Sequence, residues 1–175
     1  DGEASWLARV CNWIHARRKR KVKIRVDSYD AWSADHTLAM IIVPVLKAVR
    51  DSKSGSPTVD DEDVPEHLRS TSAPSLTEEQ RNVGATDDNW HKRWEYVLDE
   101  MIWAFEQHAD EDFETKFYSG EIDHQFVKSE ETGYTTLVTG PNHTFKVDNE
   151  GMDAALARMT NGRRLFAKYY NALWT

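Results

Sequence analysis

The spacing of apolar residues changes along the chain and divides it into helical blocks and a short strand-forming block. Apolar residues recur every three or four positions, the helical pattern, at 4–16, 33–50, 87–108 and 149–173. They alternate with period two at 22–26, and three further short strand-forming runs follow at 125–128, 134–139 and 144–147. Helices and a small antiparallel sheet in separate blocks predict an α+β fold with about four helices.

Two of the predicted helices are long, 87–108 and 149–173. Pro44 lies inside the predicted helix 33–50 and is expected to kink or divide it. Asn161 and Gly162 lie in the middle of the last helix, where they mark a weak point or a close-packing site. The three runs between 125 and 147, separated by turn residues, predict an antiparallel meander.

The chain of 175 residues has the size of one domain. Residues 51–89 are rich in turn formers and acids, so they predict a long acidic loop inserted in that domain. Within the loop, 64–69 is a candidate helical turn with Pro65 in its first turn. The chain opens on Asp1 and enters a helical pattern almost at once, which we interpret as an N-terminal truncation.

Charge is distributed unevenly. The formal net charge is −8, which argues against a protein that coats DNA generally. However, residues 1–50 carry a net charge of +5, whereas 51–89 carry −7 and 90–175 carry −6. The basic and the acidic parts are therefore separate candidate contact surfaces.

Targeting signals are absent from the sequence. No apolar run approaches the ~20 residues that span a bilayer, and no signal-peptide pattern precedes the first helix. The single cysteine, Cys11, cannot form an internal disulfide and lies among apolar residues, so a buried structural thiol is its expected role. We expect a protein that is neither secreted nor transmembrane.

Acidic and imidazole side chains suggest one candidate site for a divalent metal. Asp35 and His36 open the second predicted helix, and His91, Glu95 and Asp99 follow one face of the third. If the two groups met across a cleft, a metal-dependent hydrolase or nuclease would be possible. Caps of helix starts and a solvated helix face explain the same residues. No cofactor is predicted beyond this possible metal.

A basic segment suggests nucleic-acid binding as a second alternative. Its candidate residues are Arg17, Arg18, Lys19, Arg20, Lys21, Lys23 and Arg25. Lysine and arginine side chains contact phosphates, and nearby Trp13 and Tyr29 have rings that stack on bases. Solvated basic connections have the same composition.

The acidic run Asp60, Asp61, Glu62 and Asp63 is the candidate partner-binding site. It suits a basic protein surface, either on a partner or on this chain's own domain. A solvated loop is the plainer alternative. Calcium is disfavoured because the spacing does not match an EF-hand loop.

Five strings of residues together resemble a known family. They are 20–27, 29–38, 59–70, 94–106 and 162–170. In order and content they resemble a family of uncharacterised small proteins encoded by tailed bacteriophages and abundant in viral metagenomes. The resemblance extends from about Trp6 to Trp174. It implies a viral origin and a location in the bacterial host cytoplasm or the virion, and it supplies no catalytic residues.

Common catalytic fingerprints, such as a phosphate-binding loop, GxGxxG, HExxH and GxSxG, are absent from the sequence. Seven tryptophans offer aromatic anchors for a protein contact. The sequence therefore favours a non-enzymatic phage protein that binds a viral or host protein. The oligomeric state is left open.

Overall fold

The computed structural model describes residues 6–7, 13, 24–128, 130 and 133–174. The chain divides into two compact units, Asp1–Trp32 and Ser33–Thr175, and each is described by itself. The larger unit contains α2 (Ala34–Ser52), α3 (Glu78–Asn82), α4 (Trp90–His108) and α5 (Asn149–Lys168). With two small antiparallel sheets beside these helices, the fold is α+β, as the sequence predicts.

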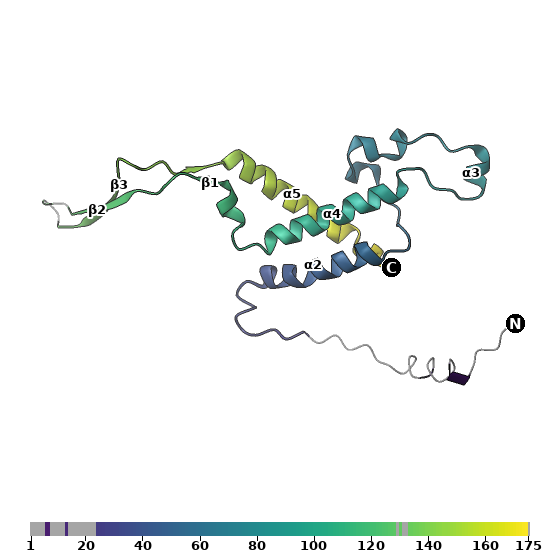
Figure 1. Ribbon diagram of the computed structural model, residues 1–175, viewed down its shortest axis with the longest axis horizontal. Coiled ribbons are helices and arrows are strands. Elements are labelled where there is room, and N and C mark those ends of the chain that lie inside the picture. Colours follow the sequence, from purple (N-terminus) through teal and green to yellow (C-terminus); the bar gives the residue numbers. More distant parts are fainter. Residues whose placement is uncertain (1–5, 8–12, 14–23, 129, 131–132, 175) are drawn as a thin grey trace. The chain divides into compact units, whose positions relative to one another are not determined.

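Three long helices form the body of the larger unit. The central helix, α4, packs against both α2 and α5 (Figure 1). It supplies more of the core than any other element because its apolar residues face both neighbours. The largest fully buried side chains are Trp94, Val97, Leu98 and Met101 of α4, Leu46 of α2 and Leu165 of α5. Pro44 lies within α2, which continues through it as one helix.

Gly162 explains how closely α4 and α5 approach. A Cβ atom added there would lie 2.6 Å from the carbonyl oxygen of Glu100 and still closer to the Cβ of Ala104. Beside it, Glu100 accepts a bidentate hydrogen bond from Arg158, whose guanidinium lies 3.9 Å from the ring centre of Trp103. The Asn161–Gly162 pair is therefore a close-packing site.

The segment between α2 and α4, predicted as an acidic loop, contains secondary structure. It forms short 3-10 helices at Asp61–Asp63, Glu66–Leu68 and Ser70–Ser72, followed by α3. The second of these confirms the predicted turn, with Pro65 at its N-cap. Val59 and Val64 are both 5% exposed and belong to the main core, so the segment is anchored on either side of the acidic run.

The predicted meander is wrong in its last strand. β2 (His124–Lys128) pairs with β3 (Thr135–Thr139), as expected, but β4 (Lys146–Val147) pairs with β1 (Tyr118–Ser119). The reason is a pair of backbone hydrogen bonds. The amide of Asp148 donates to the carbonyl of Phe117, and the amide of Thr144 donates to the carbonyl of Glu121. These bonds hold 144–148 beside 117–121 instead of beside β3.

The smaller unit does not contain the predicted strand 22–26 in its described part. Residues 24–26 belong to neither sheet, and Ile24 and Val26 are more than half exposed. Alternating apolar and polar residues form a stable strand only where a neighbouring strand completes the backbone hydrogen bonds. The predicted turn at 27–30 is confirmed by the bond from the Asp30 amide to the Asp27 carbonyl.

Within the described residues, no helix combines the length and the apolar character needed to cross a membrane.

Candidate functional site

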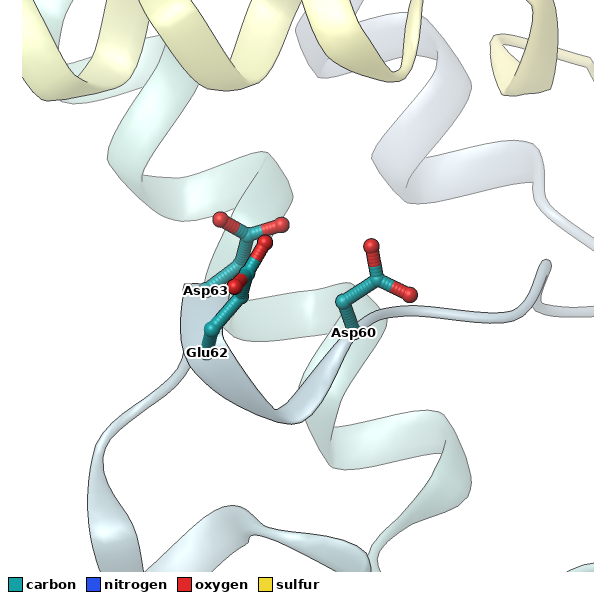
Figure 2. A group of neighbouring side chains, drawn as sticks. All are labelled: Asp60, Glu62 and Asp63. Atoms are coloured by element: carbon teal, nitrogen blue, oxygen red, sulfur yellow. The ribbon is translucent and has the colours of Figure 1, made fainter.

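The acidic run Asp60–Asp63 lies against the C-terminal end of α5. Figure 2 shows the carboxylates of Asp60, Glu62 and Asp63 on one side of the turn, facing α5. The turn takes this orientation because Val59 and Val64 bury their side chains on either side of it. The run thus binds a basic surface of its own chain, one of the two alternatives that the sequence left open.

Asp63 is the best-bound of these acids. Its side chain is 1% exposed, and each of its oxygens has a partner from α5 or the residue after it. Arg164 donates to Oδ1 at 2.6 Å, and the Tyr169 hydroxyl donates to Oδ2 at 2.7 Å. The backbone amide of Asp60 donates in turn to the same hydroxyl at 3.0 Å. Tyr169 therefore links the two ends of the acidic run.

Lys168 lies at the centre of the cluster. Its Nζ is 2.7 Å from an oxygen of Asp60, 3.1 Å from one of Glu62 and 2.6 Å from Oδ2 of Asp63. The carboxylate oxygens of these three acids lie within 4.8 Å of one another, a spacing that suits a metal ion. In this structure the lysine ammonium binds all three acids and, together with Arg164, offsets two of their three negative charges. We call Asp60, Glu62, Asp63, Arg164, Lys168 and Tyr169 the α5 clasp.

The pKa values of the clasp follow from this geometry. Burial would raise the pKa of Asp63, but hydrogen bonds from Lys168, Tyr169 and Arg164 outweigh burial and lower it. The hydrogen bonds from Lys168 to Asp60 and Asp63 raise the pKa of Lys168. Burial, helped by the bond to Asp63, raises the pKa of Tyr169 to about 12. Near neutral pH, Lys168 is therefore charged and Tyr169 keeps its proton.

The predicted partner-binding residues thus have different surroundings. Asp61 turns away from the clasp and accepts from the backbone amide and the hydroxyl of Ser70. The side chains of Asp60 and Glu62 are 56% and 78% exposed and keep surface that a partner can reach. Asp63 has no such surface.

The five predicted metal ligands are not brought together. Asp35 and His36 lie at the N-terminal end of α2, where they contact His108 at the C-terminal end of α4. The remaining three lie between the first turn and the middle of α4 and bind the other end of α2 or the residues after it. His91 pairs with Ser56, Glu95 with Lys53, and Asp99 with Arg50. The antiparallel packing of α2 and α4 separates the two groups by about half the length of α4 or more.

At the N-terminal end of α2, two further residues that the sequence did not indicate lie beside Asp35 and His36. His108 Nε2 lies 3.0 Å from a carboxylate oxygen of Asp35, and Glu111 lies 4.0 Å from Nε2 of His36. The backbone amide of His36 and the side chain of His108 lower the pKa of Asp35. In the described residues, only the three acids of the clasp form a group with metal-ligand spacing.

The predicted nucleic-acid-binding segment lies mostly outside the described residues. Of its seven residues only Arg25 is described, and it pairs with Asp27 at 3.3 Å, with both side chains exposed.

An apolar groove lies between α2 and the C-terminal end of α5. Its volume is about 390 Å³. It is lined by Ile41, Ile42, Val45, Leu46, Phe166, Tyr170 and Leu173. Leu46 is fully buried, whereas Val45 and Tyr170 are 54% and 62% exposed. The sequence had assigned these residues to helix cores, so spacing alone did not show that part of the stripe is open.

The β2–β3 hairpin extends away from the three helices (Figure 1). Every residue of both strands is exposed. Among them are Phe126, 78% exposed, and Leu137, 52% exposed, which are cross-strand partners. The hairpin is thus a second apolar surface that the larger unit leaves uncovered.

No protein-family model, curated protein or solved structure matches this chain.

Proposed function

We propose that this chain is a non-catalytic protein-binding module of a tailed bacteriophage, acting as a virion component or as a factor that contacts a host protein. The observation that carries the proposal is the apolar groove between α2 and α5. The five strings that resemble a bacteriophage family support the viral origin.

The groove suits one helix face of a partner protein. Grooves of this kind bind an amphipathic helix, whose apolar anchors recur every three or four residues. Here Leu46 forms part of the floor, while Val45 and Tyr170 extend to solvent from opposite sides. Contact between such apolar side chains and water is unfavourable. A partner helix that buries them gains roughly 25 cal/mol per Å² of apolar surface, and this burial supplies most of the binding free energy.

Site-specific photo-crosslinking during phage infection tests this proposal. A photoreactive side chain replaces Val45 at the edge of the groove, and Val83, 81% exposed after α3 and outside the groove, serves as the matched control position. We expect one viral or host protein to be crosslinked at position 45 and not at 83, through a segment with helical apolar spacing. Equal crosslinking at both positions, or none at 45, would contradict the proposal.

A charge variant separates binding from folding. Val45→Glu adds a charge at a half-exposed groove position and is expected to abolish the crosslink from a photoreactive side chain at Tyr170. Val83→Glu adds the same charge elsewhere and should leave that crosslink intact. Both variants should keep the wild-type thermal midpoint within a few degrees, because both sites are exposed. A Val45→Glu protein that crosslinks like the wild type would refute the groove as the contact.

A further inference from the structure

The outer edge of β3 is a strand edge without the usual protection. Edge strands normally carry a charge, a proline or a bulge that prevents pairing with another chain. β3 has the sequence Thr-Thr-Leu-Val-Thr, with no charge and no proline, and it pairs one-to-one with β2 without a bulge. Its five residues are all exposed. No strand among the described residues pairs with this edge, so it can accept another strand.

The hydrogen-bond pattern of the hairpin identifies the groups on that edge. Gly140 donates to the carbonyl of Asp123, which makes 123 and 140 a hydrogen-bonded pair. Because such pairs alternate in an antiparallel ladder, Thr136 and Val138 direct their backbone groups to β2. Thr135, Leu137 and Thr139 therefore direct their N–H and C=O groups outward.

From this edge we infer that β3 pairs with β3 of a second copy of this chain, antiparallel and about a two-fold axis at Leu137. The sequence of β3 reads almost the same in both directions, so the register places Thr135 opposite Thr139 and Leu137 opposite itself. A two-fold contact requires such self-complementarity. The result is a four-stranded sheet in the order β2-β3-β3-β2.

Charge favours this pairing over the alternative through β2. Pairing β3 with itself brings only neutral side chains opposite one another. Pairing β2 with itself about Phe126 would place His124 opposite Lys128, two basic residues. Lys128 also protects the outer edge of the four-stranded sheet, so association ends at the dimer.

Side-chain contacts favour the same arrangement. Phe126 and Leu137 are cross-strand partners and share a face of the hairpin. In the dimer, the order Phe126, Leu137, Leu137, Phe126 forms one continuous apolar stripe across the four strands. Cross-strand pairs of this kind stabilise a sheet, and an isolated two-stranded hairpin is only marginally stable in water.

Sedimentation velocity of the full chain, over loading concentrations that bracket the expected dissociation constant, tests the inference. The contact is small, so we expect a reversible dimer with a dissociation constant on the order of 100 μM. Leu137→Lys places two ammonium groups opposite each other and should raise that constant at least tenfold. Phe126→Lys, on the outer strand, is the matched control and should raise it less.

A mixing experiment makes the test specific for the two-fold axis. Leu137→Lys and Leu137→Glu proteins should each be monomeric alone, and their equimolar mixture should regain the dimer because opposite charges meet. A monomeric wild type at the highest concentration would overturn the inference. So would a mixture no more dimeric than its components. The groove is a different surface, so Val45→Glu should dimerise normally, and failure here leaves the crosslinking result at Val45 unaffected.

Discussion

The ammonium of Lys168 lies 2.6 Å from Oδ2 of Asp63, although 105 positions separate the two residues in the sequence. The contact joins the segment before α4 to the last turn of α5. Asp63 also accepts from Arg164 and Tyr169, so its loss breaks three contacts at once, whereas loss of Lys168 leaves two of them in place.

Asp63→Asn tests the contribution of the α5 clasp to stability. The amide fills the same volume but cannot accept three charge-assisted hydrogen bonds. We expect the free energy of unfolding to fall by about 3 kcal/mol, the lower end for a broken buried pair, because Arg164 and Lys168 are partly solvated. Urea denaturation measures the change. Glu62→Gln removes an exposed partner of Lys168 and should cost under about 1 kcal/mol. Equal losses in the two variants would contradict a dominant role of Asp63.

Lys168→Ala should convert the clasp into a divalent-metal site. The substitution removes the ammonium, while the carboxylates of Asp60, Glu62 and Asp63 keep their spacing. We expect millimolar Ca²⁺ to raise the thermal midpoint of this variant and to leave that of the wild type unchanged. Differential scanning calorimetry with and without Ca²⁺ measures both midpoints. The double variant Lys168→Ala with Asp63→Asn is the control and should lose the response to Ca²⁺.

Tyr169 should make the protein sensitive to alkali. Its pKa is raised from the usual 10 to about 12 in the folded chain, so the protonated hydroxyl stabilises the fold below pH 10. That contribution is lost as the pH rises through about 12. The free energy of unfolding, measured by urea denaturation at successive pH values, should fall over this interval. In Tyr169→Phe the fall should be shallower, and an identical slope in both proteins would contradict the assignment.

Gly162→Ala should destabilise the contact between α4 and α5. In an exposed helix this change stabilises by up to about 1 kcal/mol, but here the new methyl meets Ala104 and the carbonyl of Glu100. We expect a net loss of about 1–3 kcal/mol, the usual cost of overpacking. Thermal unfolding measures it. The second-site change Ala104→Gly should recover part of the loss, because it removes one of the two contacts. A Gly162→Ala protein more stable than the wild type would refute the close approach.

Asp87→Asn should leave a cation buried without its counter-charge. Arg93 is 2% exposed and binds Asp87 through two hydrogen bonds of 2.9 and 2.7 Å. Removing the charge of Asp87 should cost about 3–5 kcal/mol of unfolding free energy. The neighbouring Asp88 is exposed, so Asp88→Asn is a matched control with an expected change within about 0.5 kcal/mol. Urea denaturation of the two variants compares them directly.

The spacing of apolar residues predicted helices and strands well where the apolar face that it defines is the one that packs in the structure. The third helix was expected at 87–108 and is found at Trp90–His108, because its wide apolar stripe lies in the core between two neighbours. The last helix begins at Asn149 as expected, capped by Asp148, and its α-helical part ends at Lys168 instead of near 173. The β2–β3 pairing was also predicted, since both strands lie close in sequence.

Long-range contacts were the part that local pattern missed. The pairing of Tyr118 with Val147 depends on a closed loop, which nothing in a two-residue strand reveals. The acidic half of the clasp was predicted as a contact, but its basic half was missed because the apolar spacing of α5 drew attention to Phe166 and Tyr170 instead of Arg164 and Lys168. A signal was present: these two bases are spaced i, i+4, and the acidic run they bind lies between two valines. A search for acidic and basic residues on amphipathic segments can thus list candidate ion pairs, but the sequence alone does not show which acid meets which base.

The clasp also orders events during synthesis. The ribosome adds about a hundred residues between the synthesis of Asp60 and Asp63 and that of Arg164, Lys168 and Tyr169. Until then the carboxylates lack the Arg164 and Lys168 partners of the folded protein, and Val59 and Val64 lack the α5 part of the core they join. The larger unit therefore cannot complete its fold vectorially, from the first helix onward, while translation proceeds. Its final structure waits for the last turn of α5, and a nascent chain stalled before that turn is expected to be a substrate for chaperones and proteases.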